Sequence, residues 1–262
     1  MKKTVILFFL MSVFCFSCNK DEINKDKIDI EKKDCTAAFG TKGLTLYTFN
    51  PFTAEEWKKT DHNELIRRRQ IPDDFLKKMN THELFVQFIH MDMAKDALLF
   101  NTNQQGFRRI IDLYNMLQEL YKRDDTPDYF IRKLQEVNIK EVKNNECHFH
   151  YLCLRMLSAQ KEVIGKMNKS QTLNYINTVS QIITEIAELS FTDPNWQTLS
   201  SYDFEMIGHG NIMIKYEYPP FMELMQSNKK VRLYMDGVIP LDKELIGLIE
   251  NCMMKFYKQL NS

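Results

Sequence analysis

Apolar and polar residues between Ile71 and Val137 recur with the period of an α-helix. In the clearest run, the apolar side chains fall at spacings that gather them on one helix face. That run consists of Phe107, Ile110, Ile111, Tyr114, Leu117, Leu120 and Tyr121. Charged residues occupy the opposite face, where water can solvate them. The pattern predicts one unbroken helix across these positions.

Turn and capping residues divide this stretch into several helices. Pro72 suits the first turn of a helix, because its missing N–H would be unpaired there anyway. Thr81 and Thr126 are placed to cap the helices that follow them, and Pro127 stands at a first helical position. We therefore expect amphipathic helices joined by short turns.

The same signals continue outside this stretch. Thr53 and Glu56 have the spacing of a capping box, and the helix that they begin should break near Asp61. Further helices are expected from Glu141 to Met167, after a cap at Ser170, around Trp196 to Met206 and after a cap at Asp242.

Residues 208–218 fit two structures. Ile212, Ile214, Tyr216 and Tyr218 alternate with polar or less apolar neighbours, which is typical of an edge strand. The same residues fit a helix between Gly210 and the prolines that follow. We favour the helix, because a lone strand would have no neighbour to pair with.

The fold expected from these patterns is all-α, with stacked antiparallel helices and a superhelix resembling a short helical repeat as one form of it. Only eight glycines and seven prolines occur, which argues against a sandwich of short strands. Residues 44–262 should form a single helical domain, and subdomains over 44–137 and 138–262 are left open. No clean sequence period defines a formal repeat.

Part of the chain is similar to a known group of proteins. The residues are Pro72, Phe75-Leu76, Met79-Asn80-Thr81, Glu83-Leu84, Phe100-Asn101, Gln104-Gln105-Gly106-Phe107, Leu117, Glu119-Leu120 and Arg123-Asp124-Asp125. This pattern of helix faces and turns resembles a helical region of lipoproteins of unknown function from Bacteroidetes-type bacteria. The resemblance is firmest over residues 53–137. It implies an all-helical, secreted protein and brings no catalytic residue with it.

The first residues form a targeting segment. Lys2 and Lys3 precede an apolar run from Val5 to Phe16, and Cys18 ends it. We expect a signal peptide over residues 1–17 and lipidation of Cys18, with acyl chains such as palmitate anchoring the protein in a bilayer. Cys15 stands where a lipobox usually has an aliphatic residue, and an ordinary cleaved signal peptide is the alternative.

A charged stretch follows Cys18. Lys20, Asp21 and Glu22 resemble the export signal that sends Bacteroidetes lipoproteins to the outer face of the outer membrane. A plain polar tether is the alternative reading, and residues 18–43 are expected to be flexible. The expected location is the outer membrane at the cell surface, with its periplasmic face as the alternative.

Charge excludes some partners. Lysine and arginine total 35, and aspartate and glutamate also total 35, so no net field attracts nucleic acid. Arg67, Arg68 and Arg69 form the strongest basic run, which we interpret as a solvated face, with a phosphate or glycan-acid site as the alternative. Motifs for phosphate or dinucleotide loops are absent, and we expect no cofactor.

Two clusters carry candidate chemistry. Cys147, His150 and Cys153 are potential metal ligands, but on a continuous helix they spread too widely for one ion. His209 lies between Gly208 and Gly210, in an expected flexible turn, and is a candidate general base. Buried thiols and an exposed histidine are the simpler interpretations.

The expected function is a binding or scaffolding module for a peptide, protein or glycan, and an enzyme is less favoured. The alternative is a hydrolase with a non-local acid/base site that includes His209. Stacked helices would offer a groove or concave face. Most aromatic residues should belong to the core, and the best candidates for lining the groove are Tyr114, Tyr121, Trp196, Tyr216, Tyr218 and Phe221.

Overall fold

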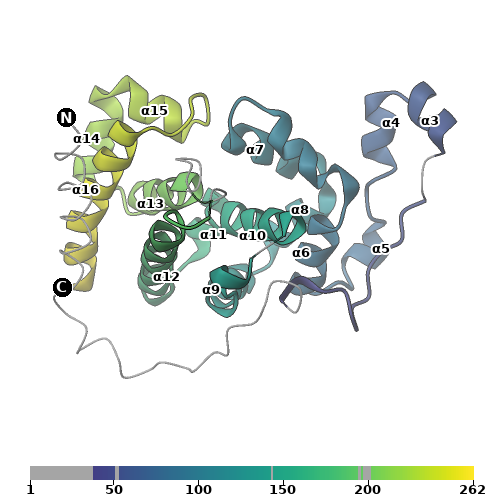
Figure 1. Ribbon diagram of the computed structural model, residues 1–262, viewed down its shortest axis with the longest axis horizontal. Coiled ribbons are helices and arrows are strands. Elements are labelled where there is room, and N and C mark those ends of the chain that lie inside the picture. The colour runs from purple at the N-terminus through teal and green to yellow at the C-terminus, as the bar shows by residue number, and fades with distance from the viewer. Residues whose placement is uncertain (1–37, 51–52, 143, 194–195, 197–201) are drawn as a thin grey trace. The chain divides into compact units, whose positions relative to one another are not determined.

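The computed structural model describes residues 38–262 except 51–52, 143, 194–195 and 197–201. Cys18 and the predicted export signal at Lys20, Asp21 and Glu22 lie outside the described residues. Within the described part, the regular secondary structure is helical and includes no strand (Figure 1). The all-α prediction is confirmed, and the repeat-like superhelix stays a prediction. The described residues belong to one compact unit.

Short connections join most of the helices. The first half comprises α3 (Ala54–Lys59), α4 (His62–Arg67), α5 (Asp73–Leu76), α6 (Thr81–Ile89), the 3₁₀ helix η1 (Asp92–Leu99), α7 (Asn103–Leu113), α8 (Asn115–Lys122) and α9 (Thr126–Glu136). The second half comprises η2 (Ile139–Glu141), α10 (Asn145–Ser158), α11 (Lys161–Lys166), α12 (Lys169–Leu189), α13 (Asp203–Lys215), α14 (Pro219–Ser227), α15 (Lys229–Met235) and α16 (Lys243–Asn261). Helices α12, α13 and α16 pack against one another (Figure 1).

Several predicted helix starts are confirmed. Thr53 and Glu56 form a capping box at the start of α3. Asp61 breaks the helix and caps α4, and Asp242 caps α16 through the N–H of Leu245. In each case a short oxygen-bearing side chain satisfies an N–H that the first helical turn leaves unpaired.

Three predicted caps are wrong, because another residue takes the capping position. Asn80, not Thr81, caps α6, and the Thr81 hydroxyl donates to Asp125 instead. Asn168, not Ser170, caps α12 in a box with its third helical residue. α9 begins at Thr126 itself, whose hydroxyl donates to the carbonyl of Leu120.

The predicted unbroken helix from Phe107 to Tyr121 is wrong, because it breaks at Tyr114, whose backbone is extended. The Gln70 side chain compensates for the break. Its amide nitrogen donates to the carbonyl of Leu113 at 3.0 Å, and its oxygen accepts from the N–H of Asn115, also at 3.0 Å. A distant side chain thus satisfies two backbone groups that the break exposes.

The predicted helix from Glu141 to Met167 also breaks, after Ala159. Gln160 is fully buried there, and its amide nitrogen donates to Gln104 and to the carbonyl of Met156, each at 3.0 Å. The carbonyl of Ala159 accepts from the Asn211 side chain at 2.8 Å. Side-chain amides again replace helical hydrogen bonds.

The helical interpretation of residues 208–218 is confirmed as far as Lys215, where α13 ends and a turn follows. The expected flexible turn at residues 208–210 is wrong. A Cβ at Gly208 would lie 2.8 Å from the Tyr175 hydroxyl, and one at Gly210 would lie 2.4 Å from Met235. These glycines lie within a helix and permit close packing rather than a turn.

Residues 44–50 form an extended segment without regular secondary structure. This segment lies along α6 and precedes α3 in the sequence. The backbone N–H of Thr45 donates to Glu83 at 3.0 Å, and that of Tyr47 donates to Gln87 at 2.7 Å. Glu83 and Gln87 are one turn apart on α6, and they match two N–H groups that are two residues apart on the segment. This pairing fixes the position of Tyr47.

Candidate functional site

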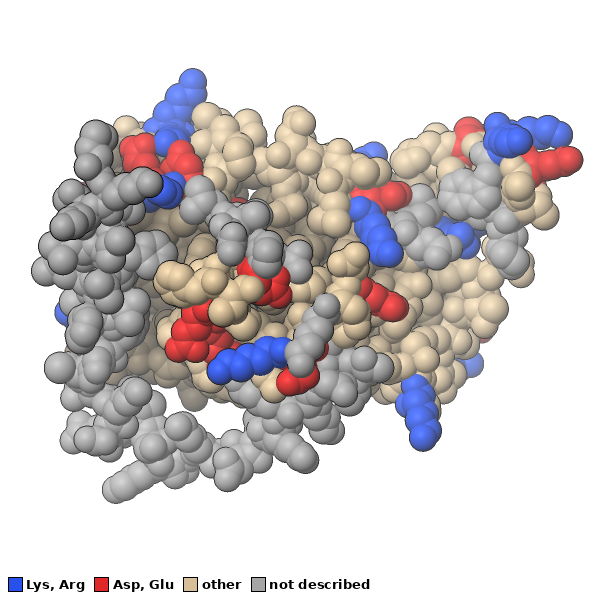
Figure 2. Space-filling model, in the orientation of Figure 1, with Lys and Arg blue, Asp and Glu red and all other residues tan. Residues whose placement is uncertain are grey.

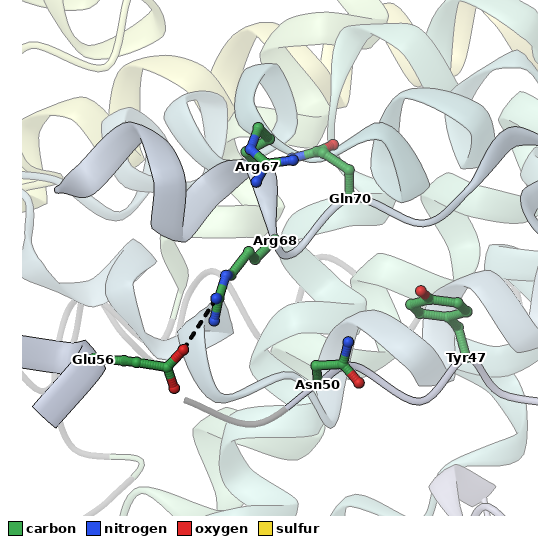
Figure 3. A pocket seen from close by; sticks show the side chains of 6 residues that line it. All are labelled: Tyr47, Asn50, Glu56, Arg67, Arg68 and Gln70. Carbon is green, nitrogen blue, oxygen red and sulfur yellow. Dashed lines mark hydrogen bonds and ion pairs between the residues drawn. The ribbon is translucent and has the colours of Figure 1, made fainter. Parts of the chain in front are cut away.

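A pocket of about 430 Å³ opens where the extended segment meets α3 and the end of α4 (Figure 3). The residues that line it are Tyr47, Asn50, Glu56, Arg67, Arg68 and Gln70. All of them carry a polar group, and one of them also offers an aromatic ring. The pocket therefore suits a ligand with many hydrogen-bonding groups.

Aromatic packing and hydrogen bonds hold the lining in place. The Tyr47 ring meets Phe49 and Phe75 edge-on, with ring centroids 5.1 and 5.3 Å apart. The Gln70 side chain is held by its hydrogen bonds to the backbone at the break between α7 and α8. Among the described residues, the side chains of Tyr47 and Asn50 form no hydrogen bond, so they can bind a ligand.

The charges in the pocket are paired. Arg67 donates twice to Glu64, at 2.6 and 2.7 Å. Arg68 donates to Glu56 at 3.1 Å, as Figure 3 shows, and to Glu64 at 3.3 Å. The hydrogen bond from Arg67 is the main cause that lowers the pKa of Glu64, and hydrogen bonds from Thr53 lower the pKa of Glu56. Two guanidinium groups thus face two carboxylates.

The predicted basic run does not form one solvated face. Arg67 is largely exposed, but Arg69 is buried, and its guanidinium carbon lies 5.5 Å from the centre of the Phe49 ring. On the face shown in Figure 2, described basic and acidic side chains are interspersed. Because Arg69 is buried and Arg67 and Arg68 are paired with glutamates, the run does not form a patch of positive charge alone.

His209 is buried within α13, with 4% of its surface exposed. Neither ring nitrogen has a hydrogen-bond partner among the described residues. Burial lowers its pKa to about 4, so the ring is neutral near pH 7. Among the described residues, no acid or nucleophile lies in hydrogen-bond contact with it, as a general base would require.

We expect His209 to make stability depend on pH. The pKa of His209 is about 4 in the folded chain, against an ordinary value of 6.5. Between these pH values the unfolded chain binds a proton at His209 and the folded chain does not. Neutral His209 therefore contributes about 3 kcal/mol to the free energy of unfolding above pH 6.5. This contribution is lost as the pH falls from 6.5 to 4. Urea unfolding at pH 7 and at pH 4.5 measures the stability lost between the two pH values. His209→Met should lose less stability than the parent does.

Exposed His62 provides the control for that measurement. His62→Gln should lose as much stability between the two pH values as the parent does. An equal loss in His209→Met and the parent would contradict the assignment of this pH dependence to His209.

The structure does not assemble the predicted cysteine–histidine metal site. Helix α10 runs unbroken through Cys147, His150 and Cys153, and both cysteines are buried free thiols. Burial also raises the pKa of Cys153, which disfavours the thiolate that a metal needs. The group that could hold an ion within the described residues is instead His90, Glu146 and His150. Sequence reasoning missed His90 and Glu146, although the four-residue spacing of Glu146 and His150 was a signal.

The aromatic residues expected to line a groove belong mostly to the core. Five of them are buried: Tyr114, Tyr121, Trp196, Tyr218 and Phe221. Tyr216 is half-buried, and its ring packs against Phe256. These side chains therefore mainly fill helix–helix contacts, as expected for most of them, and the groove stays a prediction.

The core also contains an ion pair that sequence reasoning missed. Arg155 on α10 donates twice to Glu205 on α13, at 2.7 Å each, and both residues are at most 4% exposed. The guanidinium lies over the ring of Phe204, at 5.3 Å from its centre. Burial raises the pKa of the neighbouring Asp203 to about 6, and Tyr234 donates a hydrogen bond to that carboxyl group. The contacts link α10, α13 and α15.

No family model, curated protein or solved structure matches the chain. Within the described ranges, none of the helices combines the length and the apolarity needed to cross a bilayer. Among the described residues, the polar pocket and the histidine–glutamate group present side chains that a ligand or an ion could contact. The pocket can bind and orient a polar ligand.

Proposed function

We propose that this chain is a lipid-anchored binding protein of the outer membrane, and that its polar pocket holds a glycan. The observation that carries the proposal is the composition of the pocket. The ring of Tyr47 and the amide of Asn50 stand beside arginine–glutamate pairs. Sugars present apolar ring faces and many hydroxyl groups, which such a lining can contact at the same time.

The paired charges favour a neutral glycan over an anion. Arg67 and Arg68 each already donate to carboxylates, so a phosphate or glycan acid would have to compete with Glu56 and Glu64. A hydroxyl group can instead donate to a carboxylate and accept from a guanidinium without separating the pair. This argument selects the neutral form of the glycan alternative.

Anchoring rests on the leader and on Cys18. The basic start and apolar run are typical of a signal peptide, and the Cys18 stretch resembles a lipobox. Lys20, Asp21 and Glu22 support a position on the cell surface through their resemblance to the export signal. A surface-anchored binding protein would hold glycans beside the cell.

Binding and anchoring can be separated in one experiment. Cells that make the full chain are incubated with a panel of fluorescent neutral and acidic oligosaccharides. We expect at least one neutral oligosaccharide to bind. Asn50→Ala and Tyr47→Phe should each weaken its binding about tenfold, since each removes one hydrogen-bonding group. Cys18→Ala should abolish cell-bound signal while the released protein keeps its affinity.

Tyr257→Phe is the matched control, because its hydroxyl donates to Asn177 far along the chain from the pocket residues. It should bind as the parent does. Binding that survives both pocket variants, or no binding of any oligosaccharide, would refute the glycan site. Cell-bound signal that persists in Cys18→Ala would refute the anchor alone.

A further inference from the structure

Two histidines and a glutamate converge where the end of α6 meets the start of α10. His90, Glu146 and His150 each offer one ligand atom, and these atoms lie within 4.8 Å of one another. Glu146 Oε1 is 3.9 Å from His150 Nε2. The rings of His90 and His150 meet edge-on, with their centroids 4.7 Å apart. Two imidazoles and a carboxylate from two packed helices thus share a small volume.

A hydrogen bond fixes which nitrogen of His90 is available. Its Nε2 lies 2.9 Å from the carbonyl oxygen of Phe39. A carbonyl oxygen can only accept, so Nε2 carries the proton and Nδ1 keeps its lone pair. Metal-binding histidines commonly donate their other N–H to a backbone carbonyl in this way. His90 is therefore held in a form that can bind a cation.

The surroundings of His150 also suit a cation. This residue is 5% exposed and its ring packs edge-on against His90, so it is held beside the other two ligands. The positive charge of Lys95 disfavours a cation at this position. Its amine lies 5.8 Å from the centre of the Phe149 ring. The Glu146 carboxylate supplies the negative charge that offsets it.

We propose that His90, Glu146 and His150 bind a divalent transition-metal ion of the zinc class, with solvent completing its coordination. Zinc takes imidazole nitrogen and carboxylate oxygen at about 2.0–2.2 Å, which places neighbouring ligand atoms about 3.4 Å apart in a tetrahedron. The three atoms must therefore move inward by about 1 Å. Glu146 has a side chain that is 69% exposed, and His90 is exposed too, so both can make this shift.

Zn²⁺ titrated calorimetrically into the full lipidated chain in detergent tests this site. We expect one ion per chain, and His90→Gln and Glu146→Gln should each weaken binding at least tenfold. Both positions are exposed, so these variants should keep the fold, which circular dichroism checks. His62→Gln removes an exposed histidine elsewhere and should leave the affinity unchanged.

Co²⁺ provides a second readout that identifies the ligands. Nitrogen and oxygen ligands give visible ligand-field bands without the sulfur-to-cobalt charge-transfer band of a thiolate site. A charge-transfer band would overturn the proposal, because the ligands would then include cysteine. Absence of saturable Zn²⁺ binding, or unchanged affinity in both His90→Gln and Glu146→Gln, would overturn it as well.

Discussion

Replacing Arg155 with methionine should lower the free energy of unfolding by about 3–5 kcal/mol. The substitution leaves the Glu205 carboxylate buried without the guanidinium that donates to it twice at 2.7 Å. Glu205 is 2% exposed, so water cannot replace the lost donors. An uncompensated buried charge is among the most destabilising consequences of a single substitution. Urea unfolding monitored by circular dichroism measures the loss.

The double variant separates the ion pair from the packing around it. Combining Arg155→Met with Glu205→Leu removes both charges and keeps most of the volume, so much of the lost stability should return. A double variant as unstable as the sum of its single variants would show that the pair contributes mainly through packing. Lys59→Met breaks the exposed ion pair with Glu55 and serves as the comparison. It should change the free energy of unfolding by less than about 1 kcal/mol.

Gly106→Ala should destabilise the protein by at least about 3 kcal/mol, because overpacking against backbone cannot be relieved by a rotamer change. A Cβ at this position would lie 1.8 Å from the carbonyl oxygen of Ala97 and 2.7 Å from its carbonyl carbon. Helix α7 packs directly on η1 here, so one of the two must shift. The same urea experiment measures the effect.

Gly165 on α11 is the matched control. It is also a helical glycine, but nothing lies within 4 Å of a Cβ built there. Gly165→Ala should therefore stabilise the protein by up to about 1 kcal/mol through helix propensity. Equal destabilisation by both substitutions would show that the contact with Ala97 is not the cause.

The helical character of most of the described chain follows from local signals, whereas the positions of the helix breaks do not. Caps such as Asp242 act on N–H groups three residues away, so local sequence predicts a helix start there, but neighbouring polar residues such as Asn80 and Thr81 compete for the capping position. The break at Tyr114 depends on Gln70, and the break after Ala159 depends on Asn211. The apolar spacing is the same on either side of Tyr114, and periodicity therefore cannot detect the break. Contacts between distant residues decided both cases.

The candidate sites depended even more on tertiary contacts. Glu146 and His150 share a helix face, but His90 joins them only because the end of α6 packs on α10. The pocket likewise combines residues from the extended segment, α3 and α4. The glycines that flank His209 predict a turn, whereas in the structure they permit close helix packing. The local sequence shows which residue types are present, but it does not show which distant residues they contact in the fold.

The extended segment offers a route for divergence among proteins with this fold. Its backbone is held through the N–H groups of Thr45 and Tyr47, which bond to side chains of α6. Any residue except proline supplies that N–H, so these two hydrogen bonds place little constraint on the side chains at positions 45 and 47. Substitution of exposed Asn50 could therefore change what the pocket recognises, while Glu83, Gln87 and the core-packed side chains of Tyr47 and Phe49 stay the same. Specificity and stability would then evolve at separate positions.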